Sequence, residues 1–226
     1  MKKTVPAPSG RRPPRSAADP SPPESGRPPK ALVVLQAARR VFFRHGFSAA
    51  TTDMIQREAG VSKSTLYVHF RNKEGLFSAV IRSECRRQID GARLRSAGGQ
   101  TVRARLTNLA RAYLGILMKA ETVALYRIVL EVSTVFPHLA ELFYDSGPRA
   151  VYEAIEEILV AAIRNGELKR PRGGTRPAAQ LFAAMVRGEP YLDHVLFPWK
   201  KPPREELEAW VRLAVDSFLS ACAAQK

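Results

Sequence analysis

Apolar residues recur at helical spacing along most of the chain. From residue 30 onward, Val34, Ala38 and Phe42 fall four residues apart on one stripe, and arginine residues lie off it. Gly46 is expected to end this helix, because glycine often terminates helices. Strand-type alternation of apolar and polar residues does not persist over a useful length. The pattern therefore predicts an all-α protein.

Three further helices are predicted directly after the first one. A hydroxyl of Thr51 or Thr52 can cap the first of them, which should end before Gly60. Ser62 can cap the next helix, which runs to about residue 70. Asn72 can cap a fourth, and its apolar stripe contains Leu76, Phe77, Val80, Ile81 and Cys85. Four helices within about 60 residues predict a compact helical head.

Longer helices are predicted in the rest of the chain, separated by breaks that contain proline, glycine or both. We expect them over residues 101–119, 121–134, 138–146, 148–165, 177–188 and 204–223. The sequence thus divides into a Pro-rich tail over residues 1–29, the helical head over 30–90 and a larger helical body over 91–226.

Positive charge is concentrated toward the N-terminus. The formal net charge is +15, and residues 1–29 carry six basic and two acidic groups, whereas residues 30–90 carry eleven and five. The tail contains too few large apolar side chains to fold alone, so we expect it to be disordered. It adds nonspecific attraction to phosphates, or it is a solvated leader without a specific role. The basic head favours a polyanionic partner, such as nucleic acid or an anionic membrane surface.

The segment TDMIQREAGVSKSTLYVHF, residues 52–70, has the pattern of a helix-turn-helix. Gly60 can adopt the positive φ that the tight turn requires. Ile55 and Leu66 are expected to be buried between the two helices, together with Ala59 and Val61. The second helix is then left short, polar and basic on its outer side.

Residues 37–81, AARRVFFRHGFSAATTDMIQREAGVSKSTLYVHFRNKEGLFSAVI, resemble the DNA-binding domain of the tetracycline-repressor (TetR) family. Residues 126–155, YRIVLEVSTVFPHLAELFYDSGPRAVYEAI, are similar to the C-terminal domain of AefR-like members. The resemblance implies a three-helix DNA-binding domain and a helical effector-binding and dimerisation domain, with about nine to ten helices in all. It also implies a homodimeric repressor that binds an inverted repeat in double-stranded DNA and is released by a small-molecule effector.

By this resemblance, the helix that starts at about Lys63 lies in the major groove. Lys63, Ser64 and Thr65 then become the candidates for contacts with base edges, and Lys63 is the best single candidate for specificity. The remaining DNA-contact candidates are Thr52, Ser62, Tyr67, His69 and Lys73, whose hydroxyl, phenol, imidazole and amine groups can bind the sugar-phosphate backbone.

Some of these candidates also have structural interpretations. Tyr67 can pack against the fourth helix instead, and His69 can be a structural hydrogen-bonding residue. Asp53 departs from the family pattern, because some members place a basic, base-contacting residue there. It is therefore expected to stabilise its own helix N-terminus.

Aromatic and apolar residues of the body are candidates for an effector pocket, although such residues at helical spacing are usually ordinary core. The pocket candidates are Tyr113, Leu117, Tyr126, Phe136, Phe143, Tyr152, Phe182 and Met185. The last two helices carry wide apolar faces, which the resemblance assigns to dimerisation and which can alternatively be buried within one subunit. The dimer candidates are Leu181, Leu207, Trp210, Val211, Ala214 and Phe218.

Other classes of protein find little support in the sequence. Cys85 and Cys222 lie far apart, without further cysteine or spaced histidine nearby, so we expect neither a disulfide nor a metal site, although Cys85 can in principle sense oxidants. No apolar run approaches the length of a membrane span, which favours a cytoplasmic protein. Nucleotide-binding and hydrolase motifs are absent, so we expect no cofactor and no enzymatic activity.

Two alternatives remain open at this stage. One is an enzyme or metabolite-binding module that carries a DNA-binding head, for which the clustered Glu153, Glu156 and Glu157 are the weak hint. The other is a regulator that has no effector or is controlled by a protein partner. A cavity in the body would favour the sensor.

Overall fold

A computed structural model describes residues 29–96 and 99–222 of the chain. In that part, every regular element is an α-helix, as the periodicity predicted. The expected disordered tail lies outside the described residues, apart from Pro29 at the start of the first helix. No helix in the described part is both long and apolar enough to cross a membrane.

The head begins with helices whose breaks and caps lie at the residues that the sequence indicated, although α1 continues for three residues beyond Gly46. Gly46 interrupts the first helix with a φ of 73°, and one further turn follows it. Thr51 Oγ1 accepts a hydrogen bond from the Met54 amide at 3.1 Å, and Gly60 adopts the left-handed conformation with a φ of 64°. The bounds of the first four helices are α1 Lys30–Ala49, α2 Thr52–Ala59, α3 Lys63–His69 and α4 Lys73–Ser96.

The N-termini of α3 and α4 are capped by the residues expected from the sequence. Ser62 Oγ accepts a hydrogen bond from the Thr65 amide at 3.1 Å. Asn72 Oδ1 accepts one from the Gly75 amide at 2.8 Å. Both caps satisfy amides that have no partner inside their own helix, so these two helix starts are determined locally by the sequence.

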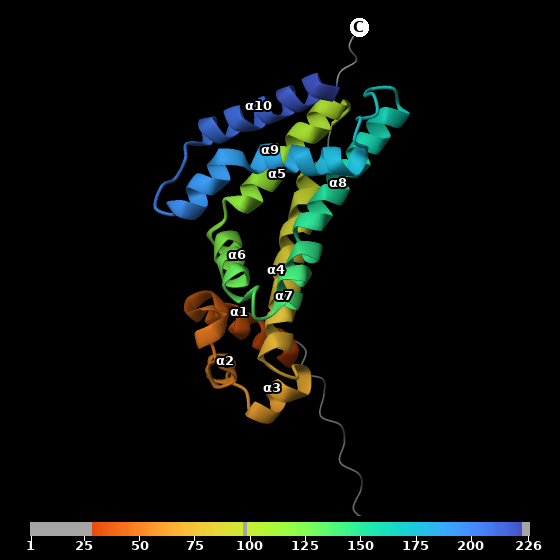
Figure 1. The fold of residues 1–226 in the computed structure, drawn as a ribbon. Coiled ribbons are helices and arrows are strands. Elements are labelled where there is room, and N and C mark those ends of the chain that lie inside the picture. Colours follow the sequence, from red (N-terminus) through yellow and green to blue (C-terminus); the bar gives the residue numbers. More distant parts are fainter. Residues whose placement is uncertain (1–28, 97–98, 223–226) are drawn as a thin grey trace, which may run out of the picture.

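The body contains the remaining helices, and Figure 1 shows α9 and α10 at the end of the molecule opposite to α2 and α3. The long helix α4 runs from the head toward that end and packs against α5 and α7. The bounds are α5 Val102–Leu117, α6 Ala120–Val132, α7 Pro137–Ser146, α8 Pro148–Arg164, α9 Thr175–Leu196 and α10 Arg204–Cys222.

The helix expected to end at residue 188 continues to Leu196 beyond a kink. Gly188 has non-helical angles, with φ 28° and ψ −148°, and Pro190 lacks the amide that would bond to the Val186 carbonyl. The Trp210 indole replaces that donor, because its Nε1 lies 3.1 Å from the carbonyl oxygens of both Met185 and Val186. The sequence break at 188 is therefore a stabilised bend rather than a helix end.

Two large clusters of buried side chains form most of the interior of the described residues. One lies between α5, α8, α9 and α10, and the other lies under α1 to α4. The second cluster also contains Leu125, Ile128 and Val132 of α6 and Leu139 of α7, all of them buried. The core of the head is thus completed by helices that follow residue 90 by more than 30 positions in the sequence, so a boundary at residue 90 does not separate the two cores.

Three of the residues expected at a dimer interface are instead interior residues of one subunit. Val211, Ala214 and Phe218 are each less than 5% exposed and belong to the body core. Phe218 packs against Phe182 of α9, with ring centroids 4.9 Å apart. For these three residues, the alternative of burial within one subunit is the correct one, because their stripe on α10 faces α9 and α5.

Candidate functional site

The helix-turn-helix presents the outer side of α3 at the end of the molecule farthest from α10 (Figure 1). Leu66 is 1% exposed and anchors α3 on the head core. Because successive residues of an α-helix turn by about 100°, Ser64 and Val68 lie on the side opposite Leu66. Both are exposed, and Val68 is 78% exposed. This side of α3 is therefore free to enter a groove.

Lys63 is paired across the turn with Asp53. Its Nζ lies 3.1 Å from Asp53 Oδ1, and both side chains are 60% exposed. The hydrogen bond to Asp53 raises the pKa of Lys63, so the ammonium is charged. An exposed pair of this kind contributes little to stability, which leaves Lys63 able to exchange Asp53 for another acceptor at low cost. Asp53 thus has a second partner besides its own helix terminus.

Hydroxyl groups gather at the N-terminus of α3. Ser62 Oγ lies 2.8 Å from both Ser64 Oγ and Thr65 Oγ1, in addition to capping the helix. Nearby, the hydroxyls of Thr52 and Tyr67 are 3.4 Å apart and exposed. The structure therefore brings five of the DNA-contact candidates into one polar surface, in which Ser62 is engaged locally as the cap.

Lys73 has a structural position that the sequence did not indicate. Its Nζ donates hydrogen bonds to the carbonyl oxygens of Phe47 at 3.0 Å, Ser48 at 3.3 Å and Ala50 at 3.1 Å. It also lies 4.5 Å from the centre of the Phe47 ring. An ammonium group has three protons, so these bonds occupy all of its donors. Lys73 thus ties the end of α1 to the start of α4, and a phosphate would have to displace one of these carbonyls to bind it.

A pocket of about 90 Å³ lies in the body and is lined by residues of α4 to α9. Five of the predicted residues line it, namely Tyr113, Leu117, Tyr126, Phe143 and Tyr152. The other three do not. Phe136 packs on Phe47 in the head-side core, Phe182 packs on Phe218, and Met185 supplies a carbonyl to the kink of α9. All eight candidates are aromatic or apolar residues of the body, but tertiary packing places these three outside the pocket.

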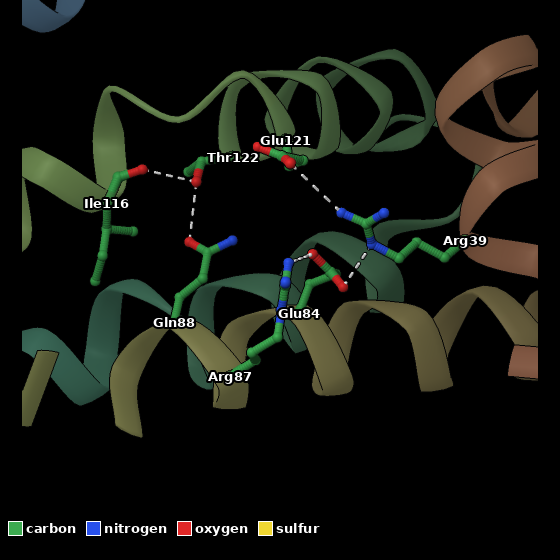
Figure 2. A network of polar contacts seen from close by, with 7 residues as sticks. All are labelled: Arg39, Glu84, Arg87, Gln88, Ile116, Glu121 and Thr122. Atoms are coloured by element: carbon green, nitrogen blue, oxygen red, sulfur yellow. Dashed lines mark hydrogen bonds and ion pairs between the residues drawn. The ribbon is translucent and has the colours of Figure 1, made fainter. Parts of the chain in front are cut away.

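Several pocket residues were missed by the sequence analysis, and the polar ones among them are the most informative. Thr122 and Gln88 are buried, and Thr122 Oγ1 lies 2.9 Å from Gln88 Oε1 and 2.7 Å from the Ile116 carbonyl oxygen (Figure 2). Arg187, Tyr191 and Cys85 also line the cavity. These residues come from three different helices, α4, α6 and α9, and only Cys85, on the apolar stripe of α4, gave a signal that placed it inside the protein.

A charged cluster joins the head to the body one helical turn from the pocket (Figure 2). The Glu84 side chain is 5% exposed and accepts hydrogen bonds from Arg39 Nε at 2.8 Å and Arg87 Nη2 at 2.7 Å. Arg39 belongs to α1 and also lies 3.9 Å from Glu121 of α6. Because Gln88 follows Glu84 by four residues on α4, the pocket and this junction share one face of that helix.

No group of three or more histidine, cysteine, aspartate or glutamate side chains in the described part of the chain is placed to hold a metal ion. Burial and the neighbouring Glu84 raise the pKa of the Cys85 thiol to about 12, so this cysteine is neutral and unreactive near pH 7. Glu156, one of the clustered glutamates, accepts a hydrogen bond from Thr175 Oγ1 at 2.7 Å.

Comparison with known proteins agrees with this arrangement. Residues 34–80 match the family of bacterial regulatory proteins of the tetR family, and residues 104–224 match the C-terminal domain of AefR-like transcriptional repressors. The chain is 28% identical over 200 residues to the HTH-type transcriptional regulator YhgD of Bacillus subtilis, which covers 84% of this chain and 96% of YhgD.

Solved structures have the same fold. A TetR-family transcriptional regulator from Mesorhizobium loti superposes with a TM-score of 0.78 at 23% identity, over 86% of this chain and 97% of that one. The flavonoid-responsive regulator FrrA superposes with a TM-score of 0.73 at 34% identity, over 87% of this chain and 98% of that one. The chain belongs to the TetR family and is a helix-turn-helix transcriptional regulator.

Proposed function

We propose that the protein is a homodimeric repressor that reads an inverted repeat with α3 and leaves its operator when a small molecule enters the pocket of the body. The observation that carries the proposal is the course of α4. Leu76 and Phe77 of this helix are buried in the core of the head, while Cys85 and Gln88 line the pocket. A shift of α4 at the pocket therefore moves the core of the head, in which Leu66 of α3 is also buried.

The pocket favours a small molecule over the two alternatives considered from the sequence. A purely protein-controlled regulator needs no lined cavity in its body, and an enzyme needs reactive groups, whereas the lining here is largely aromatic and aliphatic. A ligand can release the DNA only through its different affinity for the two states, and such coupling typically amounts to about 1–3 kcal/mol. The proposal assigns no catalytic step to the chain and places it in the cytoplasm with the chromosome.

The test of DNA recognition is selection of bound fragments from a genomic or random pool. We expect recovery of an inverted repeat whose half-sites are about 34 Å apart, or slightly displaced if the DNA is deformed. Binding should weaken steeply as salt is raised, because Lys and Arg side chains displace counterions from phosphates. Recovery of unrelated fragments with equal affinity would show that the chain does not read sequence.

Lys63→Ala and Lys73→Ala form a matched pair on the two sides of the DNA-binding head. Lys63→Ala should relax base preference, because a good bidentate contact with a base contributes about 1–3 kcal/mol of discrimination. Lys73→Ala should instead lower the free energy of unfolding, since three carbonyl oxygens at the end of α1 lose their donor. Base preferences from the selection and urea unfolding curves measure both effects. If Lys73→Ala left stability unchanged and made the salt dependence shallower by about one unit, phosphate binding would be its main role.

We propose that the dimer face lies on the outer sides of α9 and α10. Leu181 and Leu213 are each 58% exposed, and small residues such as Ala184 and Ala209 are exposed beside them in sequence. Leu207 and Trp210, which are partly buried against the core of their own subunit, can contribute only their outer edges. Apolar residues that face water on adjacent helices are typical of a surface that a second copy covers.

Leu181→Glu combined with Leu213→Glu should convert the dimer to a monomer at micromolar concentration and abolish high-affinity operator binding. Each substitution would place a charge in an apolar interface. Sedimentation velocity measures the change, with Val135→Glu as a control because Val135 is 70% exposed in the turn before α7. A double variant that still sediments as a dimer would place the interface elsewhere.

A further inference from the structure

The pocket has an unusual balance of charge. Among the residues that line it, Arg187 is the only one with a formally charged side chain, and the lining contains no aspartate or glutamate. Most of the remaining surface comes from phenol rings, Phe143 and aliphatic side chains. Arg187 itself is exposed, so the guanidinium lies where the pocket meets solvent. The cavity thus has an aromatic interior and a single positive charge at its edge.

The phenols cannot neutralise that charge. Burial raises the pKa of Tyr191 to about 12, and it raises the pKa values of Tyr113 and Tyr152 as well. The positive charge of Arg187 acts on all three pKa values in the opposite direction, but burial dominates. All three phenols, like the Cys85 thiol, are therefore neutral at pH 7.

The dimensions of the pocket favour a flat occupant. The cavity of about 90 Å³ is smaller than the roughly 150 Å³ of an engineered apolar cavity that binds benzene, so an occupant must push side chains apart. The movable walls are aromatic: the Tyr126 ring has its centroid 6.1 Å from those of both Phe143 and Tyr191. A planar ring can enter between such side chains and gain stacking and edge contacts with them.

Gln88 and Thr122 add polar groups to the lining. The single proton of the Thr122 hydroxyl cannot be donated to both Gln88 Oε1 and the Ile116 carbonyl at once. With the Gln88 amide rotated by 180°, its NH₂ group donates to Thr122 and the Thr122 hydroxyl donates to the Ile116 carbonyl, so both contacts are proper hydrogen bonds. The amide oxygen of Gln88 is then an acceptor for a ligand hydroxyl.

We propose that the effector is a planar aromatic anion, whose ring lies among Tyr113, Tyr126 and Tyr191 and whose carboxylate or ionised phenol pairs with Arg187. This inference rests on the proposed effector-responsive function and specifies its ligand class. The guanidinium recognises either oxygen anion by charge-assisted hydrogen bonds, and a carboxylate can accept two of them in parallel. A cationic ligand would meet no counter-charge in the lining and would be repelled by Arg187.

The experiment measures ligand binding to the full-length protein by calorimetry in the absence of DNA. The probes are 4-hydroxycinnamate and its neutral amide, which share one shape and differ by one charge. We expect the carboxylate to bind at least tenfold more tightly than the amide to the unaltered protein. Arg187→Gln should remove this difference, and Arg187→Lys should retain only part of it. Arg212→Gln, on the exposed side of α10, is the matched control and should leave the difference unchanged.

A second arm distinguishes the two sources of the anion. For a flavonoid that carries one acidic phenol, affinity should rise as pH increases through the pKa of that phenol, and the rise should disappear in Arg187→Gln. Equal binding of carboxylate and amide together with pH-independent binding of the flavonoid would overturn the proposal, and so would binding that is insensitive to Arg187→Gln. Without ligand, the Arg187→Gln variant should bind the operator normally. A wrong ligand class can therefore be distinguished from a wrong assignment of DNA recognition.

Discussion

Gly188→Ala is expected to lower the free energy of unfolding by about 3 kcal/mol, which corresponds to a fall in melting temperature of about 6–12 °C for a chain of this size. A β-carbon at this position would overlap Cζ2 of the Trp210 ring and lie 3.0 Å from its Cε2. The backbone angles of Gly188 are also unfavourable for a residue with a side chain. Overpacking and backbone strain each typically cost about 1–3 kcal/mol.

Two further variants separate these contributions. Gly115→Ala is the control, because Gly115 lies inside α5 and nothing stands within 4 Å of the added carbon. It should be neutral or stabilising, since alanine is the better helix former. As a single substitution, Trp210→Leu should lower the free energy of unfolding, because two carbonyls lose their donor. Combined with Gly188→Ala, it should cause little further loss of stability. Strictly additive losses in thermal unfolding would mean that the clash with Trp210 is not the cause.

The second large effect is expected at the junction of α1 and α4. Arg39→Met should lower the free energy of unfolding by about 3 kcal/mol, because Glu84 is almost fully buried and would keep only Arg87 as a partner. Arg87→Met should cost far less, since Arg87 is 61% exposed and Glu84 would keep Arg39. Urea unfolding followed by circular dichroism measures both.

The double variant Arg39→Met, Glu84→Leu provides the decisive comparison. Buried ion pairs replaced by apolar residues of similar volume are often close to neutral, so we expect the double variant to regain most of the lost stability. Its operator affinity should nevertheless respond less to ligand, because Gln88 of the pocket and Glu84 of the junction lie on the same face of α4. If the double variant were less stable than Arg39→Met alone, the unpaired Glu84 carboxylate would not be the cause of the lost stability.

The sequence predicted best what is decided within a few residues of the chain. Thr51, Ser62 and Asn72 cap helices through amides three positions further on, and Gly60 turns the chain by its own φ. Short-range chemistry of this kind is independent of the tertiary fold. The end of α9, in contrast, depends on a contact that is distant in sequence. The helix continues beyond the bend at Gly188 because Trp210, 22 positions later, supplies the missing donor.

Long-range packing limited the prediction of the site. Lys73 was identified as a DNA contact, yet the carbonyls that engage it belong to residues 23 to 26 positions earlier. Phe136 and Phe182 are aromatic residues of the body like Tyr113, but the neighbours that decide between pocket and core come from other parts of the chain. Val68 gave a signal that was overlooked, since an apolar residue opposite Leu66 on a short exposed helix can contact thymine methyl groups.

The core of the head depends on α6 and α7 as well as on its own helices. Ile128 and Leu139, which are distant from the head in sequence, fill the core of the head. In addition, Ser48 of α1 donates a hydrogen bond to Glu131 of α6 at 2.8 Å. A gene fusion that joined residues 30–90 to a foreign sensor would leave this apolar surface without its cover. We therefore expect exchange of DNA-binding heads between relatives to succeed only where the sixth and seventh helices of the recipient offer a matching apolar surface.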